Sequence, residues 1–307
     1  MKHLITIIGP TAIGKTALSI QLANHYNCEI VSCDSRQFFK EMTIGTAVPN
    51  PKELAAAKHH FIQNKSIFEN YTVGDFEKEA IATIEELFKT NDYVVLVGGS
   101  GLYVNAILQG FDTFPEIDSA IRQEVNANYE KLGIGYLQGE LKKRDPDYFE
   151  KINIENPQTL LNPQRMMRFV EVCIGTSKPY SSFLNQTKNE RSFTPILIGL
   201  EAERNVMYNR INQRVDIMMT EGLLQEAKGL YHNKELNALQ TVGYRELFSY
   251  FEKEFSLEFA IEEIKKNTRR FAKRQLTWFK RDENTKWFHF ETPTHQIIDY
   301  INLNKKI

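Results

Sequence analysis

The sequence predicts an α/β fold in which a parallel sheet is flanked by helices and carries a separate, all-helical insertion. Three observations predict it. Short apolar, β-branched runs alternate with helical patterns, which is typical of a parallel sheet covered on both faces. A glycine-rich run stands between the first predicted strand and the first predicted helix. A long middle segment shows helical periodicity without a strand.

The first part of the chain supplies strands and helices in alternation. Residues 4–8 and 29–32 are apolar runs that predict buried strands. Residues 14–26 and 71–89 place apolar side chains at helical spacing. Residues 93–97 (YVVLV) are the clearest strand, and two glycines end it.

The pattern changes in the middle of the chain. Residues 114–193 are predicted to be helical and are punctuated by prolines, whereas residues 195–200 predict one more strand. After residue 200 the chain is expected to be helical almost to its end. We therefore expect a core domain formed by residues 1–113 and 194–307, and a helical insertion domain at 114–193.

The glycine-rich run matches the phosphate-binding loop G-x-x-x-x-G-K-[ST] in full. Glycines let successive backbone N–H groups point toward an oxyanion, the lysine places a cation on the terminal phosphate, and the hydroxyl is a ligand for Mg²⁺. The fold class is therefore a P-loop NTPase-like sheet, with Thr16 as the candidate metal ligand. The residues of the loop are Gly9, Pro10, Thr11, Ala12, Ile13, Gly14, Lys15 and Thr16.

A carboxylate follows the second predicted strand. If the first two strands are neighbours, Asp34 emerges beside the phosphate loop, because ligands bind at the carboxyl edge of a parallel sheet. It would act there as a Mg²⁺ ligand or a general base. An Asp that only caps the next turn is the alternative.

Composition narrows the class of protein. The formal net charge is −1, so RNA or DNA binding would need a local basic patch. The three cysteines fit neither a zinc motif nor a redox pair, and an odd number favours a reducing compartment. No segment approaches the length of a membrane span. We expect a cytoplasmic monomer that needs no membrane and no obligate protein partner.

Several ordered blocks carry a resemblance to a known family. Besides the loop they are DSRQ at 34–37, MTIGTA at 42–47, VGGSGLY at 97–103, PQRMMR at 163–168, VGYRE at 242–246 and KRQLTW at 273–278. This ordered set resembles the tRNA dimethylallyltransferases, also called the IPP transferase family, over nearly the whole chain. The resemblance implies transfer of a dimethylallyl group from dimethylallyl diphosphate to the N6 amine of the adenine on the 3′ side of the anticodon.

The resemblance also implies roles for single residues. The loop would hold the diphosphate with Mg²⁺, Arg214 would clamp it together with Lys15, and Asp34 would accept the proton of the adenine amine. Because that base is stacked in the anticodon loop, we expect it to be flipped into a pocket. The residues that match tRNA-binding positions are Asp34, Ser35, Arg36, Gln37, Ser100, Arg122, Gln164, Arg165, Met166, Met167, Arg168, Gln240, Thr241, Val242, Gly243, Tyr244 and Arg245.

A basic segment and a pair of adjacent histidines are two further candidate binding features. Residues 265–281 hold eight cations and no acid, and they predict a helix whose basic surface contacts phosphates. Adjacent histidines such as His59 and His60 do not share a helix face, so we interpret them as structural rather than as metal ligands.

Three alternatives stay open at this point. A P-loop small-molecule kinase also places an Asp after its second strand, but it would consume ATP. An adenylate isopentenyltransferase would act on free nucleotides, which the helical insertion and the basic helix disfavour. A nucleotide-dependent binding switch would leave the blocks at 98–103 and 240–245 unexplained.

Overall fold

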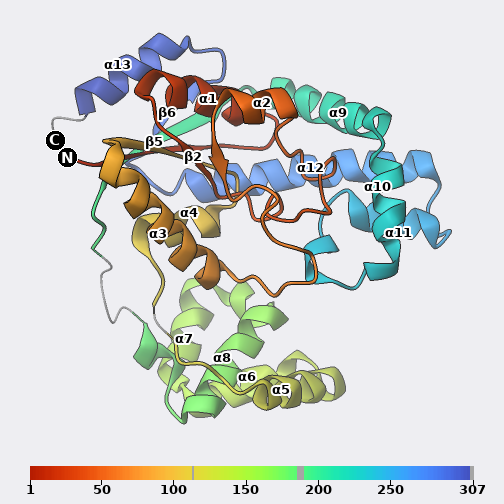
Figure 1. Cartoon of the computed structure of the whole chain (residues 1–307). Helices are drawn as coiled ribbons and strands as arrows, with labels where there is room; N and C mark the ends of the chain where they lie inside the picture. Colours follow the sequence, from red (N-terminus) through yellow and green to blue (C-terminus); the bar gives the residue numbers. More distant parts are fainter. Residues whose placement is uncertain (113, 185–189, 305–307) are drawn as a thin grey trace. The chain divides into compact units, whose positions relative to one another are not determined.

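The computed structural model describes residues 1–112, 114–184 and 190–304, and it divides the chain into two compact units (Figure 1). The core unit is formed by Met1–Gln109 and Glu190–Ile307, and the helical unit by Gly110–Asn189. Both boundaries lie a few residues before the predicted ones. On the return side the reason is Arg191, whose guanidinium donates to Ala106 O and Ile107 O and pairs with Glu77, so that this segment belongs to the core unit.

The core unit is built on a six-stranded, all-parallel sheet, which confirms the predicted fold class (Figure 1). The strand order is β3-β2-β4-β1-β5-β6. The strands are β1 (His3–Ile8), β2 (Ile30–Ser32), β3 (His59–His60), β4 (Tyr93–Val97), β5 (Thr194–Glu201) and β6 (Lys286–His289).

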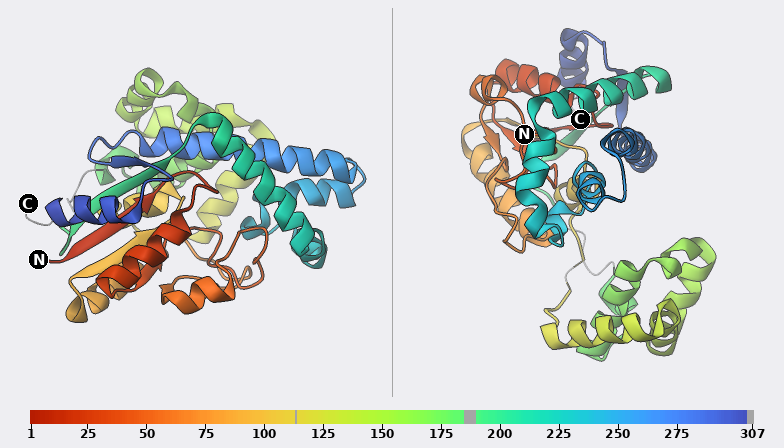
Figure 2. Two further views of the ribbon diagram at one scale, coloured as in Figure 1. Left: turned by 90° about the horizontal axis from the view of Figure 1, so that it is seen from above. Right: turned by 90° about the vertical axis from the view of Figure 1, so that its right-hand side faces the viewer.

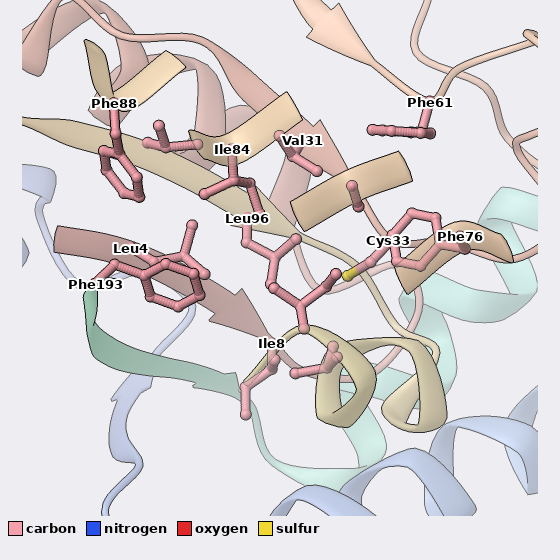
Figure 3. Close-up of a cluster of buried hydrophobic side chains, with 14 of the residues drawn as sticks. Leu4, Ile8, Val31, Cys33, Phe61, Phe76, Ile84, Phe88, Leu96 and Phe193 are labelled. Carbon is pink, nitrogen blue, oxygen red and sulfur yellow. The ribbon is translucent and has the colours of Figure 1, made fainter. Parts of the chain in front are cut away.

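Helices cover both faces of this sheet, because alternate side chains of each central strand point to opposite faces. On one face Leu4 and Leu96 pack among the aromatic side chains of α3 (Val73–Thr90), as Figure 3 shows with Phe76 and Phe88. On the other face Ile5 and Val95 pack against α1 (Lys15–Tyr26) and α13 (Thr294–Asn304). Two buried layers hold the strand ends in fixed positions.

Among the remaining helices of the core unit, α4 (Gly101–Gln109) packs beside α3, and the helices of 204–279 pack on one another (Figure 2). Helices α9 and α12 pack on each other through Ile211 and Ala272, with Ala12 of the phosphate loop against them. Besides α1, α3 and α13, the core unit contains α2 (Pro51–Ala56), α4 (Gly101–Gln109), α9 (Arg204–Glu221), α10 (Leu223–Leu230), α11 (Tyr244–Phe251) and α12 (Leu257–Phe279), with short 3-10 turns at Tyr231–Asn233 and Asn237–Leu239.

The helical unit has a core of its own. Buried side chains from four helices, among them Leu137, Leu141 and Val170, form one cluster. The helices are α5 (Ser119–Leu132), α6 (Ile134–Arg144), α7 (Pro146–Glu155) and α8 (Pro163–Thr176), with 3-10 turns at Pro157–Leu161 and Tyr180–Phe183. The described part of the predicted insertion contains helices, turns and loops and no strand, as the periodicity indicated.

Two short strands differ from the sequence-based expectations. The expectation of helix almost to the end is wrong at β6, which pairs in parallel with β5. Its four residues are too few to show a strand period, and Trp287 packs directly over Gly199, where a Cβ would come within 2.5 Å of the indole. Strand β3 consists of His59 and His60, and His60 Nε2 lies 2.5 Å from Glu29 Oε2.

Candidate active site

The phosphate loop joins β1 to α1 at the carboxyl edge of the sheet. Gly9 has φ +147° and lies against β5, where a Cβ would come within 2.6 Å of Leu200 O. Gly14 has φ +111° and caps the amino end of α1. Only glycine adopts these angles without strain, so the spacing of the two glycines follows from the backbone path. The helix amino terminus and its amides face the cavity that the loop lines.

Lys15 is the cation of this loop. Its ammonium donates to Gly9 O at 3.0 Å and to Pro10 O at 2.8 Å. Burial lowers the pKa of Lys15 to about 8, opposed by the charge of Asp34 and reinforced by that of Arg214. The amine is therefore poised to lose its proton just above neutral pH.

Asp34 lies beside the loop, although the strand order differs from the expectation. The premise that the first two strands are neighbours is wrong, because β4 pairs with both β1 and β2 and lies between them. Strand β2, which lies on the far side of β4 from β1, still places Asp34 on the wall of the same cavity as Lys15. Asp34 Oδ1 also accepts from Arg36 N at 3.2 Å, so the carboxylate caps the next turn while it lines the cavity.

Helix α9 brings two arginines to the loop from the other side of the cavity. Arg214 Nη1 lies 3.4 Å from Thr11 Oγ1, and Arg210 Nε donates to Ala12 O at 2.9 Å. The resemblance indicated only Arg214. The spacing of four residues was the signal for Arg210, because it puts both side chains on one helix face.

Two cavities meet at Asp34. The phosphate cavity, about 740 Å³, is lined by the loop, Arg210 and the segment 43–54. The second, which we call the apolar cavity, is about 460 Å³ and is walled mainly by apolar side chains such as Val242, Phe271 and Trp278. The residues that line both are Thr11, Asp34, Thr46, Ala47, Arg214 and Met218.

The run that follows Asp34 connects the walls of the apolar cavity. Ser35 N donates to Ser100 Oγ at 3.1 Å, and Arg36 Nη1 donates to Asn237 O and Ala238 O. Gln37 Nε2 donates to Thr46 O and Ala47 O. The structure thus brings together Ser35, Arg36, Ser100, Thr241, Val242 and Gly243, all of which line this cavity.

Tyr244 belongs to the tRNA-matched segment, yet its side chain is buried in the core unit. Its hydroxyl donates to Glu226 Oε1 at 2.6 Å, and the ring packs on Gly45. Glu226 also accepts from the backbone of Thr43, Ile44 and Gly45. The pair therefore fixes the loop at 42–47 that lines both cavities, whereas Gln240 and Arg245 are exposed.

In the helical unit two of the three tRNA-matched arginines share one carboxylate. Glu171 is buried, and Arg122 holds it through two hydrogen bonds of 2.9 Å. Arg168 Nη1 lies 2.5 Å from the same carboxylate. The side chains of Arg122 and Arg168 remain 61% and 37% exposed, so two partly exposed side chains pair with one buried anion. Gln164 and Arg165 are exposed, Met167 is half-buried, and Met166 is buried in the core of the unit.

The basic segment at 265–281 covers the later part of α12 and the two residues after it, and three of its eight cations have carboxylate partners. Lys265 pairs with Asp216 and Glu262, Lys266 pairs with Glu263, and Lys280 pairs with Glu201. The expectation of eight uncompensated cations is wrong because these acids come from the preceding turn and from neighbouring elements. Arg270, Lys273, Arg274 and Arg281 are exposed.

Neither a metal cluster nor a membrane-spanning helix is found among the described residues. No group of three or more His, Cys, Asp and Glu side chains could hold a metal ion there. The interpretation of His59 and His60 as structural stays a prediction, and the two residues form strand β3. No described helix is both long and apolar enough to cross a membrane.

Comparisons with known proteins agree on one family. Residues 37–282 match the family described as IPP transferase. The chain is 76% identical to a tRNA dimethylallyltransferase of Flavobacterium johnsoniae over 306 residues, which is 100% of this chain and 99% of the relative.

Solved structures give the same result. A full-length tRNA isopentenylpyrophosphate transferase of Bacillus halodurans superposes with a TM-score of 0.72 at 35% identity, covering 98% of this chain and 96% of that one. A eukaryotic dimethylallyltransferase described as acting on tRNA superposes with a TM-score of 0.81 at 26% identity, covering 99% of this chain and 80% of that one.

Proposed function

The chain belongs to the IPP transferase family of tRNA dimethylallyltransferases, and from this premise we propose that it transfers a dimethylallyl group from dimethylallyl diphosphate to the N6 amine of the tRNA adenine on the 3′ side of the anticodon. The observation that carries the proposal is the position of Asp34. It lies where the phosphate cavity meets the apolar cavity, so that a diphosphate and a base entering from different sides would meet at one carboxylate.

The chemistry of the reaction needs this arrangement. The exocyclic amine of adenine is a weak nucleophile because its lone pair is delocalised into the ring. Asp34 would accept the amine proton as the new C–N bond forms. The allylic C–O bond breaks at the same carbon, which leaves negative charge on the departing diphosphate. Lys15, Arg214 and the loop amides would stabilise that charge as it develops.

The donor set of the phosphate cavity suits a magnesium ion bound with the diphosphate. The Thr16 hydroxyl and the Asp34 carboxylate would be hard oxygen ligands, and both residues line this cavity; Mg²⁺ is commonly held by one or two such groups together with substrate phosphates. The ion would supply further positive charge to the leaving group.

The tRNA would be gripped by surfaces of both units. In the core unit these are the mouth of the apolar cavity and the exposed residues Gln240 and Arg245. In the helical unit they are Arg122 and the exposed residues of Gln164–Arg168. The adenine would enter the apolar cavity in a flipped conformation, with Phe271 and Trp278 on its wall. Because the substrate is tRNA, the reaction would take place in the cytoplasm.

The alternatives are not favoured. The relatives and the solved neighbours are named as enzymes that modify tRNA, not as kinases or as enzymes of free adenylates. Consumption of ATP without transfer to tRNA would restore the kinase alternative.

A labelling assay tests the proposal. Purified protein, Mg²⁺, labelled dimethylallyl diphosphate and unmodified tRNA should give labelled tRNA, and Asp34→Asn should lower the rate by about 10²- to 10⁴-fold, the range for a general base. Asp92→Asn is the matched control, because Asp92 precedes β4 at the opposite edge of the sheet and pairs with Lys2. Absence of label in tRNA with folded wild-type protein would overturn the proposal.

A further inference from the structure

One buried side-chain amide, that of Gln275, links α12 to the phosphate loop and to the turn that follows β4. Gln275 is 6% exposed, and both ends of its amide are bonded. Its Oε1 accepts from Thr11 N at 2.9 Å, in the phosphate loop. Its Nε2 donates to Gly99 O at 2.8 Å, just after β4. The reaction described above assigns no role to this side chain.

The glycines at 98, 99 and 101 lie in close contact with three other residues, one of which is Gln275. A Cβ at Gly99 would come within 2.3 Å of Gln275 Nε2, and a Cβ at Gly101 within 2.3 Å of the Trp278 ring. A Cβ at Gly98 would come within 2.5 Å of Cys33 Sγ. Side chains of α12 and the residue that follows β2 therefore pack directly on the backbone of this turn, and a Cβ at Gly99 would displace the Gln275 amide.

Each end of the amide leads to a group of the proposed reaction. Thr11 belongs to the loop that would hold the diphosphate, and its hydroxyl lies 3.4 Å from Arg214 Nη1. Gly99 precedes Ser100, whose hydroxyl accepts from Ser35 N at 3.1 Å. Ser35 is the neighbour of Asp34. A single side chain thus links the diphosphate cradle with the segment that carries the candidate base.

We propose that Gln275 is a positioning residue that holds the phosphate loop and the Asp34 segment in register for the transfer, an inference that rests on the proposed function. The side chain must accept from one backbone and donate to another. A primary amide does both, whereas an ionised carboxylate only accepts and a thioether does neither well. Displacement by about 1 Å from the reactive geometry can cost about 100-fold in rate.

The test compares Gln275→Met with Gln275→Glu. Met keeps most of the volume and removes both hydrogen bonds, whereas Glu keeps the acceptor for Thr11 N and loses the donor to Gly99 O. We expect Met to lower kcat for tRNA prenylation by about 10- to 100-fold and to weaken binding of inorganic diphosphate, measured by calorimetry without turnover. The KM for tRNA should stay within about twofold, because the exposed cations of α12 remain.

Two controls separate positioning from stability. Thr277→Ala changes an exposed position of the same helix and should leave kcat and diphosphate binding unchanged. Phe88→Leu weakens the core of the same unit away from both cavities and calibrates the effect of a lower Tm. Wild-type kcat and diphosphate affinity in Gln275→Met would overturn the inference, as would an equal loss of kcat in Phe88→Leu at the same Tm. If the wild-type protein prenylates no tRNA, the proposed function fails, while diphosphate binding still decides the role of Gln275.

Discussion

At the scale of single residues, Lys15 combines a proposed role in binding the diphosphate with a lowered pKa. Burial lowers its pKa from 10.5 to about 8. Diphosphate binding needs the ammonium form, so kcat/KM for the prenyl diphosphate, which reports the free enzyme, should fall as the pH rises through about 8. We expect a loss of about tenfold by pH 9, since one pH unit above a pKa leaves about a tenth of the group protonated.

The contribution of Lys15 to the free energy of unfolding should rise with pH, whereas kcat/KM should fall. A fall in kcat/KM would therefore not be caused by unfolding. Between about pH 8 and 10.5 the unfolded chain binds more protons at Lys15 than the folded chain does. The contribution of this group to the free energy of unfolding therefore rises with pH in that window. Lys15→Arg keeps its charge and should show a flat profile. A flat wild-type profile would contradict the assigned role of Lys15.

At the scale of elements, α12 carries two kinds of cation, those with carboxylate partners and those without. Lys265 and Lys266 pair with acids of the same helix and of α9. Arg270 and Lys273 are exposed, and among the described residues no ion pair is found for them. Only cations of the second kind are ready to neutralise RNA phosphates without first breaking a pair.

This difference predicts the salt dependence of tRNA binding. Replacing Arg270 and Lys273 together by Ala should reduce the slope of log K against log salt concentration by about 0.7 to 0.9 for each phosphate contact that is lost. Replacing Lys265 and Lys266 by Ala should leave the slope nearly unchanged. Filter binding of tRNA at several salt concentrations measures both variants. Equal slopes for the two double variants would contradict the assignment.

Elements whose signal is local could be predicted from the sequence. The phosphate loop, β4 and the helices of the insertion follow from motifs and periods within about 20 residues of chain. The strand order could not be predicted, because the position of β4 between β1 and β2 depends on packing of both sheet faces. The role of Gln275 was likewise hidden, since its partner Thr11 lies 264 residues away. In the sequence Gln275 belongs to the family-matched block KRQLTW at 273–278, for which the resemblance indicated no role.

At the scale of the whole molecule, the chain consists of two units with separate cores, and the two cavities are lined by residues of the core unit alone. Binding of the diphosphate and binding of the tRNA should therefore be separable by mutation. The helical unit would contribute to the second through Arg122 and the segment Gln164–Arg168.

Leu141→Ala tests this separation. Leu141 is fully buried in the core of the helical unit, and its truncation should cost that unit about 2–5 kcal/mol. We expect a large rise in the KM for tRNA with an unchanged affinity for inorganic diphosphate, because the phosphate cavity is built from the other unit. Hydrogen exchange should show faster exchange in 114–184 and unchanged protection in β1 and β4.

Ile84→Ala, in the core under the sheet, is the reciprocal control and should weaken protection of the strands and binding of diphosphate. Loss of diphosphate binding in Leu141→Ala would show that the phosphate cavity depends on the helical unit, and the separation of the two binding functions would then be wrong.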